Sequence, residues 1–527
     1  MALDASTYNQ LVVLRMLEFF DDGATWSRRL WQSGSVLIGR ELVEAGDPAM
    51  SASERAIKSL QDELLERVAV DPGLCVPSDR TAVRKMISVA PSALVKPGHA
   101  WHVVNAWVSA ARSTYLENWA VALERNTALP SAERTARLIG AHLLDEGFGR
   151  DHLHRWLTYR VKYSDDTHPL ESICRELHGQ LERGPVEFEI LVPLRAQPPL
   201  PQPTPLGWLT APQVREWRAR NIPGGAPIRQ YGGILLSVEA LDPHSAADKA
   251  RLRLTTILDR VRVGGRHEIV PDRHMWIAGL ADQKPTEAAQ RRVEVHAFER
   301  QDVLWRHRVR GDIEAAMELM APLERGASPA AVTGAWAAIE SLLVGPGDDD
   351  KQTAGDRLAL LVASGHLRAE MTTLAWAHTA SETDALATAI EGARTNQERA
   401  EFAFGHLVGG GDLSLLRSDD RHALLRARVA IGDPYRYVES VRAALQPAMR
   451  ALYRQRNLLS HAGGTSGVAI NPTLERVAPL VAAGMDRIVH VALTGGQSAL
   501  ELAALARVRH EALRGKPPAA ALAILEV

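Results

Sequence analysis

The segment Arg456-Asn457-Leu458-Leu459-Ser460-His461 holds the residue types with the clearest capacity for chemistry in this chain. Arginine is a permanently charged, planar donor that binds phosphate oxygens through parallel N–H groups. Histidine can both take and give a proton near neutral pH. Held together at one helix end, the two side chains could cut RNA without a metal ion.

The Arg-x4-His spacing is not specific by itself. It also occurs at Arg137 with His142, at Arg262 with His267, and at Arg417 with His422. The segment at 456–461 differs from these because it ends a long predicted helix. That helix starts at Asp433-Pro434, which suit an N-cap and a first helical position, and apolar residues recur along it at helical spacing. Gly463 is expected to close its C-terminus.

This arrangement resembles the HEPN superfamily (higher eukaryotes and prokaryotes nucleotide-binding), whose active members carry an Arg, a polar residue and a His near a helix end. Arg456, Asn457 and His461 occupy those three positions. Residues 335–343 resemble the first helix of the larger bacterial members, with Glu340 as the acidic residue among apolar ones, and 356–361 resemble the next helix. The resemblance covers only the C-terminal part of the chain.

The resemblance implies a metal-independent endoribonuclease with no cofactor and no bound metal. Arg456 would stabilise the negative charge of the transition state. His461 would take the proton of a ribose 2′-hydroxyl or donate one to the leaving 5′-oxygen. Asn457 would hold the imidazole or a phosphate oxygen, and Glu340 would belong to the same site. Because one histidine does not easily make both transfers, two motifs are expected to meet across a homodimer of the C-terminal domain.

Each site residue also has a purely structural interpretation. His461 could only interact with the dipole at the helix C-terminus, and Glu340 could be an ordinary charge on a solvated face. Asp356 and Arg357 are expected to be a helix-start charge and a surface charge. Arg454 is expected to be either an exposed basic residue or a second cation near the RNA.

The composition is that of a globular protein with several domains. The 527 residues are 46% hydrophobic, which excludes disorder as the main state. The formal net charge is −2, so an RNA-binding surface has to be a local patch. The two cysteines are too few for a disulfide framework or a zinc site, and the chain shows neither a signal peptide nor an apolar run of membrane-spanning length. A cytoplasmic protein without membrane contact is expected.

A mainly α-helical multidomain fold is predicted. It comprises a helical N-terminal region at 1–182, a small α/β module with a proline-rich loop at 183–310, and an all-helical HEPN-like bundle at 311–527. In the module, apolar runs predict strands near 186–192, 234–240, 268–270 and 275–278, with a helix from about 245 to 263. This front portion is expected to sense a signal or to hold the nuclease in check.

Two classes of function remain open. The first is the nuclease of a bacterial anti-phage or abortive-infection system, which cuts tRNA or mRNA under the control of a phage-derived trigger or an antitoxin partner. The second is a non-catalytic dimerisation or nucleotide-binding module with a regulatory or partner-binding role. RNA ends carrying a 2′,3′-cyclic phosphate would favour the first class, and an unchanged phenotype of His461→Ala would favour the second.

Overall fold

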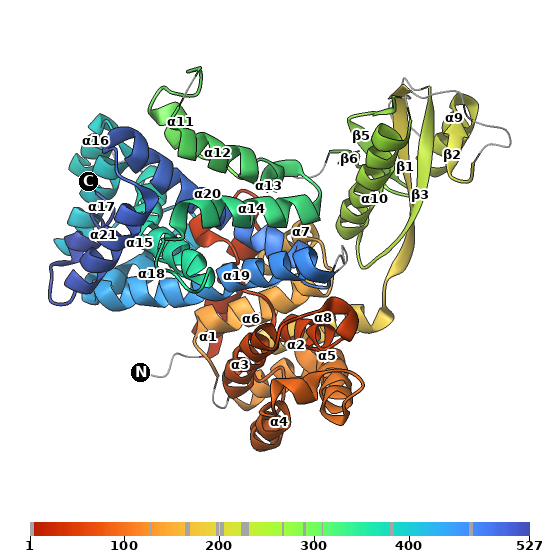
Figure 1. Cartoon of the computed structure of the whole chain (residues 1–527), viewed down its shortest axis with the longest axis horizontal. Coiled ribbons are helices and arrows are strands. Elements are labelled where there is room, and N and C mark those ends of the chain that lie inside the picture. Colours follow the sequence, from red (N-terminus) through yellow and green to blue (C-terminus); the bar gives the residue numbers. More distant parts are fainter. Residues whose placement is uncertain are drawn as a thin grey trace.

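The computed structural model describes residues 5–126, 129–163, 169–196, 200, 205–222, 231–265, 268–287, 291–307, 309–379, 384–462 and 467–526. The side chains at 5, 6, 162, 163, 461 and 462 lie outside that description. Over these ranges the chain is mainly helical with one small antiparallel sheet, as the sequence predicts (Figure 1). The exact domain boundaries stay predictions.

The N-terminal part is a helical layer whose members bury apolar faces against one another, around Phe19, Trp119 and Ile139 among others. Local capping fixes where some helices start, because the Ser53 side chain accepts the Ala56 N–H at the first turn of α3. The helices are α1 (Ala5–Phe20), α2 (Ser35–Ala45), α3 (Glu54–Val70), α4 (Arg80–Ile87), α5 (His99–Arg125), α6 (Ala132–Asp145), α7 (Arg150–Tyr163) and α8 (Leu170–Arg183). Between them lie the short 3-10 turns η1 (Trp26–Arg28), η2 (Pro48–Met50), η3 (Pro77–Asp79) and η4 (Pro91–Leu94).

The sheet follows, with β1 (Val186–Ala196) at its centre. β1 pairs antiparallel with β3 (Gly232–Ala240), from Val186 opposite Ala240 to Leu194 opposite Gly232. The shorter strands are β2 (Trp208–Thr210), β4 (Val270–Pro271), β5 (His274–Ile277) and β6 (Lys284–Pro285), in the order β2-β3-β1-β5-β6 with β4 beside β1. The strands predicted at 186–192, 234–240 and 275–278 correspond to β1, β3 and β5, whereas the one predicted at 268–270 meets β4 only at Val270. β2 and β6 were not predicted.

One helix covers each face of this sheet. Alternate residues of β1 point to opposite faces, so Ile190 and Val192 pack against α10 (Pro243–Gly264), while Leu191 packs against α9 (Ala211–Asn221). The predicted helix at about 245–263 corresponds to α10. Most of the predicted proline-rich loop at 198–205 lies outside the described residues.

The C-terminal part is a second helical body. Its helices are α11 (Ala297–Arg300), α12 (Gly311–Met320), α13 (Pro322–Arg325), α14 (Ser328–Leu343), α15 (Gln352–Ala377), α16 (Ala385–Gly392), α17 (Asn396–Val408), α18 (Ser418–Gly432), α19 (Pro434–Ala462), α20 (Ile470–Thr494) and α21 (Ala499–Ala512), followed by η5 (Pro518–Ala521). Among them, α14, α15, α19 and α20 all contact one another and form a four-helix bundle. The loop at 344–351 joins α14 to α15.

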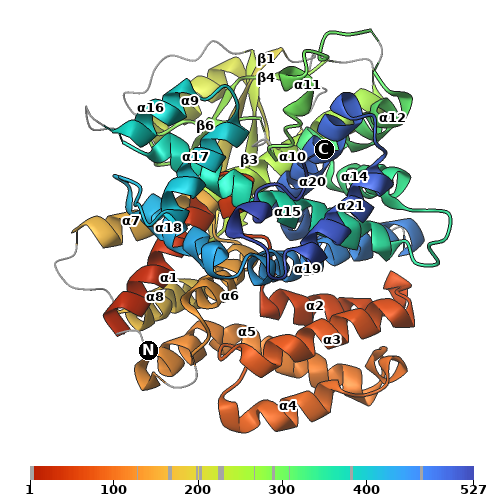
Figure 2. The ribbon, with the colours of Figure 1, turned by 90° about the vertical axis from the view of Figure 1, so that its left-hand side faces the viewer.

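The two helical bodies share a buried interface, with α19 between the N-terminal helices α2 and α3 and the bundle helices α14 and α15 (Figures 1 and 2). Trp31 from the N-terminal part belongs to the hydrophobic core of the C-terminal part. Buried ion pairs also cross the interface, including Arg28 with Asp420 at 2.6 Å and Glu41 with Arg454 at 3.0 Å. The N-terminal part therefore packs directly against α19 and covers part of its surface.

Among the described helices, only α20 is long and apolar enough to span a bilayer by length and composition. However, 67% of its apolar window is buried inside the protein. It contacts α14, α15 and α19 on its sides. This is the pattern of a core helix, and its apolar surface is already covered by protein.

Candidate functional site

The helix α19 runs as predicted from Pro434 to the end of the motif. Asp433 caps it by accepting the Arg436 N–H at 2.9 Å. Val438, Leu445 and Met449 are buried in the bundle core, which fixes the rotation of the helix about its axis. The rotation of α19 in turn fixes where the residues after position 452 point. Gly463, expected to end the helix, lies outside the described residues.

Three of the four predicted site residues meet at the C-terminal end of α19. The Arg456 side chain is 28% exposed, and its Nη2 lies 3.7 Å from Oε2 of Glu340 on α14. Its Nη1 donates a hydrogen bond to Oδ1 of Asn457 at 3.0 Å. Because Oδ1 of Asn457 is the acceptor, the amide N–H groups of that residue remain as donors.

Glu340 fixes this arrangement because both of its carboxylate oxygens have partners. The indole N–H of Trp336 donates to Oε2 at 3.0 Å, and the ammonium group of Lys351 pairs with Oε1. Glu340 is therefore not a free charge on a solvated face. Two cations, Arg456 and Lys351, share this one carboxylate, so the group of three keeps one net positive charge. Lys351 is a site residue that was not predicted from the sequence.

A pocket of about 240 Å³ opens beside these residues, between α19 and the turn from α2 to α3. We call it the Arg456 pocket. Its lining from the C-terminal part is Lys351, Tyr453, Arg454, Arg456, Asn457 and Leu458, and from the N-terminal part it is Glu41, Ala45, Ser51, Ala52, Ser53, Ala56 and Leu60. The ring of Tyr453 packs on Trp336 at 4.7 Å between centroids, so this part of the wall is firm. The pocket therefore exists only because the N-terminal part packs against α19.

Arg454 is only 5% exposed, so its interpretation as an exposed basic residue is wrong. Its Nε and Nη2 donate to the two oxygens of Glu41 at 3.0 and 3.2 Å, and its Nη1 lies 3.2 Å from Glu63. Two carboxylates thus neutralise this cation inside the protein. Arg454 anchors α19 to α2 and α3, and its charge is not available to an RNA phosphate.

The backbone of His461 belongs to the last turn of α19, one turn after Asn457. Its side chain lies outside the described part of the chain, so its catalytic role stays a prediction. Asp356 is held by α19, through a hydrogen bond from Gln446 at 3.2 Å. Arg357 donates to the Leu343 carbonyl at 2.7 Å and ties down the loop between α14 and α15. Both residues have structural partners, in line with their structural interpretation.

The other Arg-x4-His pairs differ from the 456–461 segment in burial. His142 is completely buried and stacks on Tyr115 at 4.0 Å, and burial lowers its pKa to about 3. His422 is 8% exposed, and burial together with the nearby Arg426 lowers its pKa to about 4. Both imidazoles are neutral near pH 7 and sealed from substrate. His267 lies outside the described residues.

These buried histidines predict that stability falls in mild acid. A third histidine, His366 on α15, is also buried. Burial lowers the pKa of His142 to about 3 and the pKa of His366 and of His422 to about 4, from the ordinary 6.5. As the pH falls, these histidines therefore take up protons in the unfolded chain before they do so in the folded one. Their contribution to the free energy of unfolding is fully present above pH 6.5 and is lost between pH 6.5 and about 4. We expect a loss of about 2–3 kcal/mol per histidine over that window.

Urea unfolding measured between pH 7.5 and 4.5 tests this expectation. Replacing His142, whose ring nitrogens have no partner among the described residues, by leucine should flatten the dependence on pH. The exposed His102→Gln should leave it unchanged. Equal slopes in all three proteins would show that buried histidines do not set the acid limit.

Comparison of the chain with protein-family models, with characterised proteins and with solved structures gives no match. The HEPN resemblance therefore rests on the residues of the motif, of 335–343 in α14 and of 356–361 in α15. What the geometry adds is that Arg456 contacts both its neighbour Asn457 and Glu340, which comes from a different helix.

Proposed function

We propose that the protein is a metal-independent endoribonuclease that cleaves RNA by attack of the ribose 2′-hydroxyl on the adjacent phosphate. The observation that carries this proposal is the contact of Arg456 with Asn457 and Glu340 at the rim of a pocket. These residues come from α14 and α19, two members of one four-helix bundle. They are the residues to which the resemblance assigns a role.

The chemistry needs one proton acceptor, one proton donor and a cation at the phosphate. The 2′-oxygen forms a bond to phosphorus, the bond from phosphorus to the 5′-oxygen breaks, and the products are a 2′,3′-cyclic phosphate and a 5′-hydroxyl. Arg456 stabilises the charge that grows on the phosphate oxygens, and the amide of Asn457 donates to one of them. His461 of one copy takes the 2′ proton and His461 of the second copy gives a proton to the 5′-oxygen, each step contributing about 10²–10⁴ in rate.

The size of the Arg456 pocket suits only part of a nucleotide, such as the scissile phosphate and its sugar. Its 240 Å³ lies below the roughly 300 Å³ of pockets that enclose a drug-sized ligand. The rest of the RNA therefore has to lie outside the pocket, where a second copy can approach the exposed Ser460 at the end of α19. We propose a homodimer through the C-terminal part, acting in the cytoplasm on tRNA or mRNA as the toxic arm of an anti-phage system.

A second candidate function is a non-catalytic nucleotide-binding module. The observation that favours it is the same small pocket, because Arg456 and Lys351 supply cations for a single phosphate group and Tyr453 supplies an aromatic wall. Such a module binds a mononucleotide at Arg456 and leaves RNA intact. The two functions differ in the RNA products, which can be read directly.

Sequencing of RNA 5′ and 3′ ends after incubation with the purified full-length protein in EDTA tests the proposal. The expected products are 2′,3′-cyclic phosphate and 5′-hydroxyl ends, absent with His461→Ala. A substrate with a single 2′-deoxy sugar at the cleaved position should resist, because the attacking oxygen is missing. Products with 3′-hydroxyl ends, or cleavage of the deoxy substrate, would contradict the mechanism, and intact RNA with tight mononucleotide binding would favour the second candidate.

A further inference from the structure

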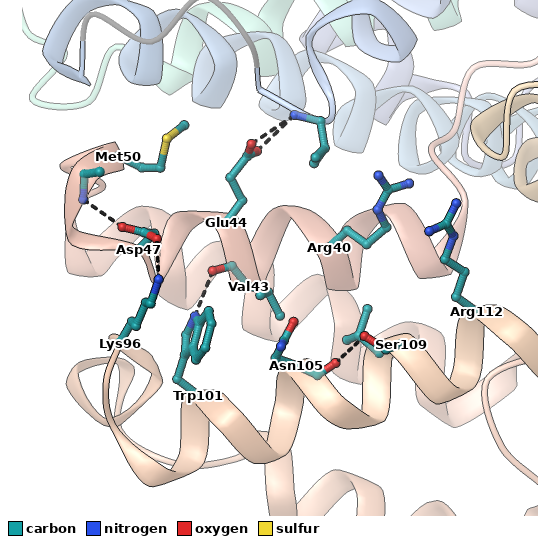
Figure 3. Close-up of a pocket in the computed structure, with 13 residues that line it drawn as sticks. Arg40, Val43, Glu44, Asp47, Met50, Lys96, Trp101, Asn105, Ser109 and Arg112 are labelled. Atoms are coloured by element: carbon teal, nitrogen blue, oxygen red, sulfur yellow. Dashed lines mark hydrogen bonds and ion pairs between the residues drawn. The ribbon is translucent and has the colours of Figure 1, made fainter. Parts of the chain in front are cut away.

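A larger pocket, of about 490 Å³, lies between α2 and α5 in the N-terminal part (Figure 3). We call it the α2–α5 pocket. Arg40, Val43 and Glu44 line it from α2, and Trp101, Asn105 and Arg112 line it from α5. The turn at 47–50 and Val468 of the C-terminal part close it. Its volume falls within the roughly 300–1,000 Å³ of small-molecule sites.

One end of this pocket is positively charged. Arg40 is half-buried and makes no hydrogen bond or close ion pair within the described part of the chain. Glu44, one helical turn along α2, attracts it, but the carboxylate of Glu44 already accepts the Val468 N–H. Arg112 has one partner, Glu146 at 2.7 Å, and its side chain is 50% exposed. Figure 3 shows both guanidinium groups rising at the same end of the pocket. An unpaired, partly buried guanidinium beside a second one is the donor set that binds a phosphate group.

The other end is apolar and rigid. The indole N–H of Trp101 donates to the Val43 carbonyl at 2.9 Å, which fixes the ring in the wall. Lys96 lies 5.5 Å from that ring and is paired with Asp47 at 3.3 Å, so its charge is already balanced. Val43, Met50 and Trp101 thus offer a surface for the ring of a ligand.

We propose that the α2–α5 pocket binds a mononucleotide-sized organic phosphate. Its phosphate lies at Arg40 and Arg112, and its ring lies along Val43, Met50 and Trp101. The polar side chains of Asn105 and Ser109, on the α5 wall, face the part of the ligand between these two ends (Figure 3).

This pocket shares a wall with the Arg456 pocket. Met50 lines the first pocket and the next residue, Ser51, lines the second. The turn η2 ends at Met50 and contacts α19. Ser51, which follows it, has a left-handed φ of 46°, a strained conformation for a residue with a side chain. Glu44, which also lines the α2–α5 pocket, accepts the Val468 N–H at 3.1 Å. A ligand that packs on Met50 therefore lies beside the turn that contacts α19 and close to Glu44, which holds Val468 beyond the C-terminal end of α19. Control of cleavage by this ligand rests on the proposed nuclease function, whereas binding does not.

Calorimetric titration of the full-length protein with AMP tests the site. We expect saturable binding of one AMP per chain, at least about tenfold weaker in Arg40→Ala, since a hydrogen bond to a charged group is lost. Ser109→Trp, at an exposed helix position where the new ring fills the pocket, should lose binding without harming the fold. Arg436→Ala, 86% exposed on α19, and Arg456→Ala should bind AMP as the wild type does. Adenosine, without a phosphate, should bind at least about tenfold more weakly.

Absence of saturable AMP binding would overturn the proposal. Binding that is lost in Arg456→Ala but retained in Arg40→Ala would also overturn it, because AMP would then bind in the Arg456 pocket. RNA cleavage measured with and without AMP separates this inference from the proposed function. If both hold, AMP changes the cleavage rate by about fivefold or more in the wild type and not in Arg40→Ala. AMP binding without any RNA cleavage would support the α2–α5 site and contradict the nuclease function. RNA cleavage without AMP binding would support the nuclease function and contradict the site.

Discussion

Replacing Arg456 by alanine is expected to slow RNA cleavage about 10²–10³-fold, the usual effect of removing one donor that stabilises transition-state charge. The fold should survive, because the Arg456 side chain is 28% exposed and its nearest carboxylate oxygen is 3.7 Å away. Such a partly exposed pair contributes about 0–1 kcal/mol to stability. Single-turnover cleavage rates, with melting temperatures of the same samples, measure both effects.

Arg450→Ala is the matched control for this experiment. Arg450 lies on the same helix, its side chain is 42% exposed, and it also has one carboxylate, Asp356, at 3.7 Å. It does not line the Arg456 pocket. Cleavage by Arg450→Ala should therefore equal that of the wild type. A similar loss of cleavage in both variants would show that the substitutions act by disturbing α19, and that the loss does not come from a missing contact with the phosphate.

The elements that position the site follow from local sequence patterns. The N-cap at Asp433 and the helical spacing of apolar residues predict α19 because both depend on neighbours along the chain. β1 and β3 are predicted for the same reason, since alternation is visible in a short window. The contact of Arg456 with Glu340 was expected only from the resemblance, because nothing local to either residue indicates the other.

The rest of the site depends on contacts between distant segments, which a single sequence does not show. Arg454 looks like a surface residue of α19, yet it is buried because Glu41 and Glu63 neutralise it from the N-terminal part. A glutamate on the apolar face of α2 was the only local signal, since a buried carboxylate needs a cationic partner. Lys351 and Ser51 lie in loops, where the spacing of residues along the chain does not indicate which way a side chain points.

A largely buried cluster of charged side chains, contributed by several helices, also joins the N-terminal and C-terminal parts. Its members are four arginines and four carboxylates: Arg15, Arg28, Arg137, Arg426, Glu18, Glu133, Glu370 and Asp420. The formal charges cancel, so each member depends on the others for compensation. Arg28 of η1 is central, with Nη1 at 2.6 Å from Asp420 and Nε at 3.4 Å from Glu370.

Arg28→Ala is expected to lower the free energy of unfolding by about 3–5 kcal/mol, because it leaves two buried carboxylates without their main cation. Glu370 is 2% exposed and Asp420 is 6% exposed, so water cannot replace the lost partner. Burial alone raises the pKa of Glu370, but the attraction of Arg28 and of Arg426 and the hydrogen bond from Ser27 act together against it, and the net effect lowers that pKa to about 2. Urea unfolding followed by tryptophan fluorescence at pH 7 measures the loss.

The exposed pair of Arg220 with Glu216, at 2.9 Å and 70% exposed on both sides, gives the control. Arg220→Ala should change stability by no more than about 0.5 kcal/mol. The double variant Arg28→Ala/Asp420→Ala should lose less than the sum of its single variants by about 1 kcal/mol or more, because the orphaned carboxylate is removed with the cation. Additive losses, or a loss below about 1 kcal/mol for Arg28→Ala, would mean that the cluster does not hold the two parts together. A large loss means that the N-terminal part cannot lift away from α19 at low cost, so any control of the Arg456 pocket has to act through local movement of its wall.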